Sequence, residues 1–274
     1  MVGYQMKYQI KLPISMPSAY FWYFYRCIYY LKKNNIAEIE WIENSINQTY
    51  VLLIYINDRP IYIDLRDDNK LSNVYKNKLD SLIFKSNYSS ELWNNTPDDF
   101  PFIFETWERD IQKKIKPFIL GRSFNDRMDL NEFDKYRPEN DKTTYNIVSF
   151  SGSALTNENS LIRLKTYELL SAIPDNNLFF WLRKHGDEIS DDVIKKANVF
   201  NCHKTQLGLI EFYKFLSNGK YSLNMPGICL SQPFRCVDAV LANRCIISTK
   251  IWCDIYKSFP CITLPICGYF GNGD

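Results

Sequence analysis

Hydrophobic and polar residues follow two different periods in the first half of the chain. From Ser18 to about Lys33 aromatic and aliphatic residues recur densely enough to predict a helix that is buried on more than one side. Residues 38–43 alternate strictly, which predicts a half-buried strand. The apolar runs 51–56 and 61–64 flank a turn-rich tetrad, so we expect a β-hairpin there.

A polar segment interrupts this pattern in the middle of the chain. Short strands are predicted at 82–85 and 118–121, and residues 121–143 are then rich in Asp, Asn, Arg and Lys. Such a segment is typical of an interdomain linker. We therefore expect two domains, residues 1–135 and residues 136–274.

The second half alternates strands with helices. Strands are predicted at 145–150, 178–182, 221–227 and 245–248, and helices at 159–172, 189–199, 206–216 and 234–242. This alternation predicts an α/β fold with a doubly wound parallel sheet.

Composition narrows the classes of partner. The 274 residues are 46% hydrophobic, and the 33 basic and 31 acidic side chains leave a formal charge of +2. No basic block stands out, so we do not expect nucleic acid as a partner. The apolar residues 19–25 are followed by Arg26 and are too few for a membrane span or a secretory signal. We expect no membrane span and a cytoplasmic location.

Seven of the eight cysteines follow residue 200, without a C-x-x-C pair. Without a secretory signal, free buried thiols are expected rather than disulfides. The chain has only two histidines, and the spacings do not match a structural zinc site.

The most specific segment for function is residues 220–248. It contains Arg235 and Asp238, which are three residues apart and share a face of the predicted helix. A sugar nucleotide carries a diphosphate and a ribose diol. A cation binds the diphosphate, and a carboxylate accepts hydrogen bonds from the hydroxyl groups of the diol. The alternative is an ordinary exposed ion pair that contributes about 0.3 kcal/mol.

This segment resembles the donor-binding region of GT-B glycosyltransferases, especially exostosin-like ones. The resemblance covers the order of elements along most of the chain. It implies two Rossmann-like domains facing a central cleft, with the donor held by the C-terminal one. One departure is Pro233-Phe234-Arg235, where many relatives carry two adjacent Arg or a Ser-Arg pair.

Several further residues are predicted to contact the donor. A glycine at a strand end lets the backbone approach a ligand, and arginines on the next helix or strand end can reach a diphosphate. Because Arg235 is the single arginine of the motif, other cations would have to complete the neutralisation of the charge on the diphosphate. The predicted donor-binding residues are Gly152, Ser153, Arg163, Arg183, Lys220, Pro226, Gly227, Ser231, Pro233, Phe234, Arg235 and Asp238.

Three aspartates follow the predicted strand 61–64. An inverting transfer needs a general base for the acceptor hydroxyl, and Asp64, Asp67 or Asp68 could supply it. The same residues would also suit a divalent metal, as in GT-A enzymes. The phosphate-type features lie in the second half of the chain, so we expect a metal-independent enzyme with no required cofactor.

Among exostosin-like proteins the chain is similar in size to the xylosyltransferases that large algal viruses use on capsid glycans. This similarity implies transfer of xylose from UDP-xylose to a fucose-containing glycan. A fucosyltransferase, or a capsule or lipopolysaccharide transferase with another donor, would show nearly the same sequence features. A non-catalytic carbohydrate- or nucleotide-binding protein remains the alternative from a different class.

Overall fold

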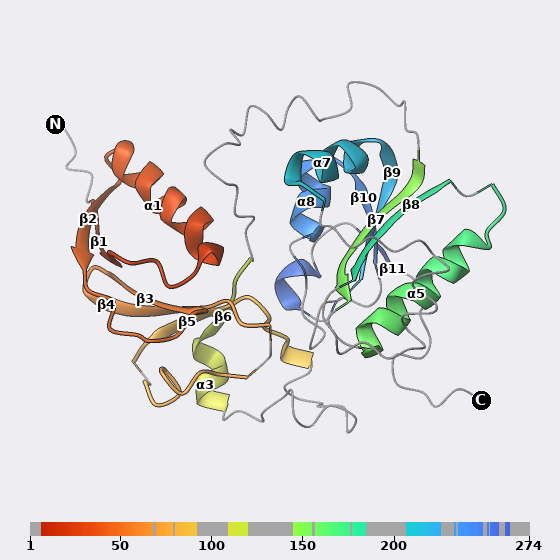
Figure 1. Ribbon diagram of the computed structural model, residues 1–274. Coiled ribbons are helices and arrows are strands. Elements are labelled where there is room, and N and C mark those ends of the chain that lie inside the picture. The colour runs from red at the N-terminus through yellow and green to blue at the C-terminus, as the bar shows by residue number, and fades with distance from the viewer. Residues whose placement is uncertain are drawn as a thin grey trace. The chain divides into compact units, whose positions relative to one another are not determined.

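A computed structural model of the chain has a mixed α/β fold with two sheets rich in parallel strands (Figure 1). It describes residues 7–67, 70–78, 80–91, 109–119, 145–154, 157–175, 177–184, 207–225, 233, 235–248, 251, 253–257 and 261–263. The chain divides into two compact units. In the described part, the N-terminal unit comprises the residues up to 119 and residues 253–257, and the C-terminal unit comprises the rest. The predicted boundary at residues 135 and 136 lies outside the described residues.

The N-terminal unit contains a six-stranded sheet in the order β2-β1-β3-β4-β5-β6. The strand β3 runs antiparallel to both of its neighbours, and the other neighbouring pairs are parallel. The strands are β1 (Tyr8–Pro13), β2 (Ala37–Ile42), β3 (Val51–Ile56), β4 (Arg59–Asp64), β5 (Leu82–Lys85) and β6 (Ile115–Pro117).

The predicted hairpin is confirmed, with a tighter turn than expected. Ile56 and Arg59 are register partners, so the loop between β3 and β4 contains only Asn57 and Asp58. Both have positive φ angles, 50° and 61°. A two-residue turn with this geometry matches the twist of the strands, and Asn and Asp tolerate it better than most residues.

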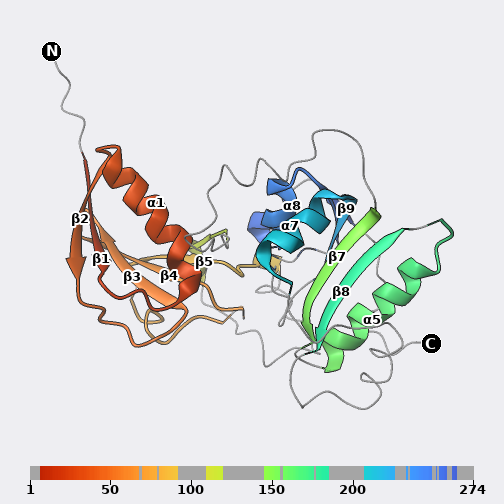
Figure 2. The same ribbon diagram turned by 45° about the horizontal axis from the view of Figure 1, so that its top comes forward.

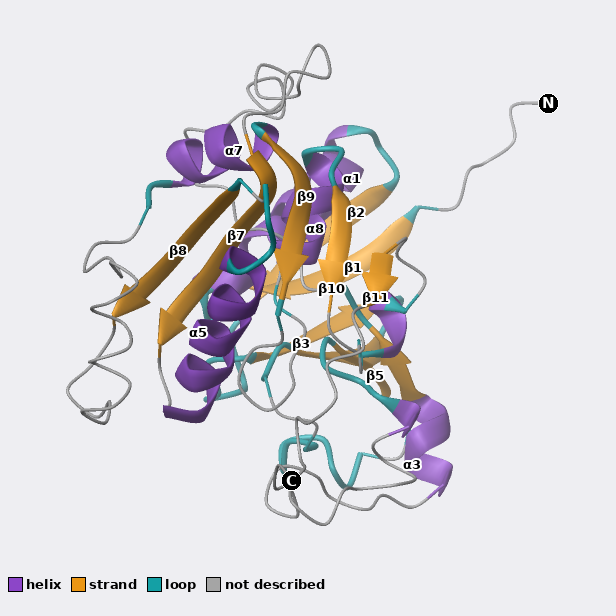
Figure 3. Ribbon diagram, turned by 90° about the vertical axis from the view of Figure 1, so that its right-hand side faces the viewer, coloured by secondary structure: helices purple, strands orange, loops and turns teal. Residues whose placement is uncertain are grey.

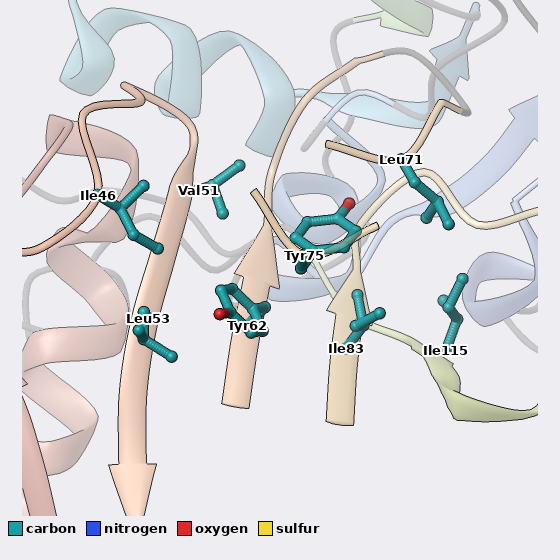
Figure 4. Close-up of a cluster of buried hydrophobic side chains, with 8 residues drawn as sticks. All are labelled: Ile46, Val51, Leu53, Tyr62, Leu71, Tyr75, Ile83 and Ile115. Carbon is teal, nitrogen blue, oxygen red and sulfur yellow. The ribbon is translucent and has the colours of Figure 1, made fainter. Parts of the chain in front are cut away.

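The two faces of this sheet are covered by different parts of the chain. Helix α1 (Trp22–Lys33), preceded by the short 3-10 helix η1 (Ala19–Phe21), lies along one face (Figure 2). There the ring of Phe118 contacts those of Phe24 and Phe84. The helix α3 (Arg109–Lys114) leads into β6. The other face carries a hydrophobic cluster drawn in Figure 4, made of Ile46, Val51, Leu53, Tyr62, Leu71, Tyr75, Ile83 and Ile115.

A segment from near the end of the sequence completes the N-terminal unit. The short 3-10 helix η3 (Asp254–Tyr256) follows Cys253, whose Sγ lies 3.3 Å from Asn87 Oδ1. The amide of Asp254 donates to the carbonyl of Tyr88, and the Asp254 carboxylate accepts from the amide of Ser90 at 3.0 Å. These bonds satisfy backbone groups of the loop after β5.

The C-terminal unit contains a five-stranded, entirely parallel sheet in the order β11-β10-β9-β7-β8. Its strands are β7 (Tyr145–Ala154), β8 (Leu178–Lys184), β9 (Gly219–Asn224), β10 (Cys245–Ser248) and β11 (Cys261–Thr263). Because β7 pairs with both β8 and β9, the chain reverses its direction across the sheet between β7 and β9. This is the doubly wound order with a switch point at its first and third strands.

Helices cover both faces of this sheet, as Figure 3 shows. Helix α5 (Asn157–Ser171) packs on β7 and β8 on one face. Helix α7 (Leu209–Ser217) packs on β7 and β9, and α8 (Arg235–Leu241) packs on β9 and β10, on the other face. Gly219, the first residue of β9, allows the close approach of this strand to β7, because a Cβ on Gly219 would lie 2.2 Å from Cγ2 of Val148 on β7.

The structure confirms most predicted elements in the described residues and adds others. The helix predicted from Ser18 to Lys33 is present as η1 and α1, but its predicted burial on more than one side is wrong, because within α1 only Ile28 is buried and Tyr29 and Tyr30 are exposed. The strands β1 and β11 and the helix α3 were not predicted. The strand predicted at 118–121 is wrong in position, since β6 ends at Pro117. The helix predicted at 189–199 and the linker at 121–143 lie outside the described residues.

Five cysteines in the described part of the chain are free thiols, as expected: Cys27, Cys236, Cys245, Cys253 and Cys261. Their expected burial holds only for Cys236 and Cys253, since Cys27 and Cys245 are exposed and Cys261 is half-buried. Within the same residues, no helix is long and apolar enough to cross a bilayer.

Candidate functional site

The carboxyl ends of β7 and β8 bring three of the predicted donor-binding residues together. Gly152 is the register partner of Leu182, and Ser153 is the register partner of Arg183. The register shifts between Phe150 and Gly152, which marks an irregularity in β7 just before this point. Bulges of this kind redirect a strand end and are frequent beside binding sites.

The ends of β9 and β10 carry a buried polar pair that the sequence analysis did not identify. Nδ2 of Asn224, the last residue of β9, donates to Oγ of Ser248, the last residue of β10, at 2.9 Å. Both residues are buried. Asn224 Oδ1 is also buried and accepts no hydrogen bond from the described residues. A polar residue at the last position of each apolar strand was the signal available in the sequence.

Arg235 and Asp238 share the buried face of α8. Arg235 is 9% exposed and Asp238 is 0% exposed, so they do not form the exposed surface pair that was the alternative interpretation. The hydroxyl of Tyr213, on α7, donates a short hydrogen bond to Asp238 Oδ1. A buried carboxylate needs such a partner, because burial without one is costly.

The remaining donor candidates are not all at this edge. Lys220 is the second residue of β9, four residues before Asn224, so it lies about 13 Å away along the strand, toward the amino end. Its Nζ is 5.4 Å from the ring centre of Tyr221. Arg163 lies in the second turn of α5 and is buried. The structure therefore separates Lys220 from the carboxyl ends.

Only one of the other predicted donor residues is described. Pro233 is half-buried, and its carbonyl accepts from the amide of Cys236 at 3.4 Å. The residues Pro226, Gly227, Ser231 and Phe234 lie outside the described part of the chain.

In the N-terminal unit, Asp64 is the centre of a buried ionic cluster at the carboxyl ends of β4 and β5. Asp64 and Lys85 are register partners, both 0% exposed, with Lys85 Nζ 3.4 Å from Asp64 Oδ2. Arg66 donates to the same carboxylate from Nε at 3.1 Å and from Nη2 at 2.8 Å. The Tyr75 hydroxyl donates a further short hydrogen bond.

These partners set the charge state of the cluster. Burial raises the pKa of the Asp64 carboxyl, but the charge of Lys85 and the hydrogen bonds of Arg66 outweigh it, so the pKa lies below its usual value. Burial and the Asp64 charge raise the pKa of Tyr75 well above its usual value. Asp64 is therefore ionised and Tyr75 protonated at neutral pH.

The cluster also fixes the loop that carries the other predicted bases. Arg66 Nη2 donates to the carbonyl of Lys70 at 2.6 Å, and the carbonyl of Arg66 accepts from Asn87 Nδ2 at 2.9 Å. Asp67, between these anchored residues, is exposed, and Asp68 lies outside the described residues. Sequence reasoning assigned no site role to Lys85 or Tyr75, although a lysine ending the apolar run 82–84 is an available signal.

Within the described residues, no group of three His, Cys, Asp or Glu side chains is arranged to hold a metal ion. The chain matches no model of a known protein family, and a search of curated protein sequences found no match either.

Proposed function

We propose that the protein is a nucleotide-sugar-dependent glycosyltransferase of the GT-B kind, with the donor at the carboxyl ends of β7 and β9. The strand order supports this site most directly, because the direction in which the chain adds strands to the sheet reverses between these two strands. Ligands of open α/β sheets bind outside the carboxyl ends of the strands at such a switch point. Ser153 and Asn224 are at those ends.

Two arginines are assigned to the donor diphosphate in this proposal. Arg183 is at the carboxyl end of β8, beside Ser153, and Arg235 begins α8. Guanidinium groups suit this role because they bind phosphate oxygens in a bidentate manner. Asp238 is fully buried and bonded to Tyr213, so we assign it the positioning of α8 rather than direct contact with the ribose.

The acceptor and the general base are assigned to the N-terminal unit. A base must come within hydrogen-bonding distance of the acceptor hydroxyl. Asp67 is exposed, whereas Asp64 is buried and bonded on both oxygens. We propose an inverting transfer with Asp67 or Asp68 as the base and Asp64 as the residue that positions their loop. The proposed donor is UDP-xylose and the proposed acceptor a fucose-containing glycan.

A thermal-shift panel tests the proposal. The nucleotides are UDP, UDP-xylose, UDP-glucose, GDP and GDP-fucose, each with and without EDTA. A ligand at 100 times its Kd stabilises the folded state by about 2.7 kcal/mol, so we expect a clear rise in Tm with the UDP compounds that EDTA does not remove. No shift with any nucleotide, together with no donor hydrolysis, would contradict the proposal. A shift without hydrolysis or transfer would favour the non-catalytic binding protein.

A further inference from the structure

The side chains of Asn224 and Ser248 leave hydrogen-bonding capacity unused at the carboxyl ends of β9 and β10. Nδ2 of Asn224 donates to Oγ of Ser248 at 2.9 Å, while Asn224 Oδ1 is buried and accepts no hydrogen bond from the described residues. The Ser248 hydroxyl accepts this bond through its oxygen and keeps its own proton to donate. The pair therefore presents one acceptor and one donor side by side.

Neither orientation of the Asn224 amide satisfies both of its polar atoms. Turning the amide over would let Oδ1 accept the Ser248 proton, and Nδ2 would then lack the partner in its place. A buried polar atom without a hydrogen-bond partner destabilises the folded protein. The pair is thus unfavourable in the free protein, and a ligand that carries a donor next to an acceptor satisfies it.

Asn224 points to the sheet face that α8 covers. Its neighbours Leu223 and Met225 belong to a hydrophobic cluster that includes a residue of α5, on the opposite face. Because side chains alternate along a strand, Asn224 and its register partner Ser248 lie on the α8 side. The chain passes from β9 into α8, which begins with Arg235, the residue assigned to the diphosphate. The pair and this arginine are therefore on the same side of the sheet.

The ladder between β7 and β9 ends before these strands do. Its last register pair is Val148 with Ser222, whereas β7 pairs with β8 as far as Ala154 and β9 pairs with β10 as far as Asn224. Beyond Val148 the described sheet thus divides into two pairs of strands, at the switch point of the strand order. A ligand bound at the switch point lies beside the end of β9.

We propose that Asn224 and Ser248 bind the uracil ring of the donor, with Asn224 Oδ1 accepting from N3–H and the Ser248 hydroxyl donating to O4. This assignment rests on the proposed function and names the part of the donor that the ends of β9 and β10 recognise. Uracil carries its N–H and C=O groups on adjacent ring atoms, which is the complement of an adjacent acceptor and donor. Guanine carries the same edge at N1 and O6, so the test includes GDP.

A sugar ring fits this buried pair less well than a base. Its hydroxyl groups surround the ring, and most of them would lose their hydration here without gaining a partner. The polar groups of uracil lie along one edge, and the rest of the ring is apolar. A bidentate contact of this kind also fixes the orientation of the base, since both of its bonds lie in the plane of the ring.

Calorimetric titration of the full chain with UDP, 3-methyl-UDP and GDP tests the assignment. In 3-methyl-UDP a methyl group replaces the N3 proton, so we expect at least about 10-fold weaker binding than for UDP. This comparison uses the unchanged protein and does not depend on the folding of a variant. Equal affinity for the two nucleotides would overturn the assignment and leave the proposed function intact.

The double variant Asn224→Leu/Ser248→Ala removes both polar groups and keeps their approximate size. It should bind UDP at least about 10-fold more weakly and no longer distinguish UDP from 3-methyl-UDP. Its Tm without ligand should be unchanged or higher, because both partners become apolar together. The matched control is Ser222→Ala, a buried serine earlier on the same face of β9, which should keep the full affinity for UDP.

The outcomes separate this assignment from the proposed function. Undiminished UDP affinity of the double variant, or a lower Tm with the discrimination against 3-methyl-UDP retained, would overturn the assignment and give the pair a structural role. Binding of GDP in place of UDP, lost in the double variant, would support the same contacts with guanine as the base. Binding of no nucleotide to the unchanged protein would overturn the proposed function and the assignment with it.

Discussion

Replacing Asp64 by Asn is expected to destabilise the protein by about 3–5 kcal/mol, the cost of removing one partner of a buried ion pair. Lys85 and Arg66 both direct their charges at the Asp64 carboxylate, and Lys85 is fully buried. The substitution keeps the size of the side chain and removes the negative charge. Denaturant unfolding of the two proteins measures the difference.

A double variant separates loss of the pair from loss of packing. Lys85→Met removes the buried cation and keeps most of its apolar stem. In Asp64→Asn/Lys85→Met, the loss of stability should be smaller than the sum of the two single losses by about 1 kcal/mol or more. Additive losses would show that the two side chains are not coupled, in contradiction to their 3.4 Å separation.

The same ion pair has a defined pH dependence. The pKa of Asp64 is lower in the folded state than in the unfolded chain, where it is about 3.9. Its contribution to stability is therefore complete above about pH 4 and is lost as the pH falls through the lower, folded pKa. Asp64→Asn should unfold with a weaker pH dependence in that acid range.

Asp67→Asn is expected to lower the rate of glycosyl transfer by about 10²–10⁴-fold, the typical contribution of a general base. Asp67 is exposed in a loop held by Arg66, so donor binding and the Tm should stay unchanged. The measurement is transfer from UDP-xylose to a fucosylated acceptor, with donor affinity measured in parallel.

Asp80→Asn is the matched control for Asp67→Asn, because Asp80 is another exposed aspartate of the same unit. It should transfer at the normal rate. Full activity of Asp67→Asn would move the role to Asp68, which the same assay examines with Asp68→Asn. Full activity of both would contradict an aspartate base in this loop.

The fold was largely predictable where period and turn chemistry agree. The alternating residues of β2, the hairpin β3-β4 and the strand-helix alternation of the C-terminal unit all carry these signals. The strand β1 also alternates, with Ile10 and Leu12 buried, but its six residues precede a much stronger helical run. The strand β11 has three residues, too few for a period to be recognised.

The candidate site was predictable in residue type but not in register. The sequence indicated that Arg235 and Asp238 share a helix face, and the structure confirms that both lie on the buried face of α8. It did not indicate that Asp64 is opposite Lys85, since strand pairing joins residues that are far apart in the chain. The sequence analysis also grouped Lys220 with the donor residues. Lys220 lies near the amino end of β9, whereas the candidate donor site lies at the carboxyl end of that strand.

Hydrogen–deuterium exchange with and without UDP tests the location of the donor site most directly. We expect slower exchange at residues 152–154 and at Asn224, which are the carboxyl ends of β7 and β9, and at residues 235–238, which begin α8. Exchange at Gly219 and Lys220, at the amino end of β9, should not change. Protection at the amino ends, or no protection in the C-terminal unit while UDP is bound, would contradict the donor site at the switch point of this sheet.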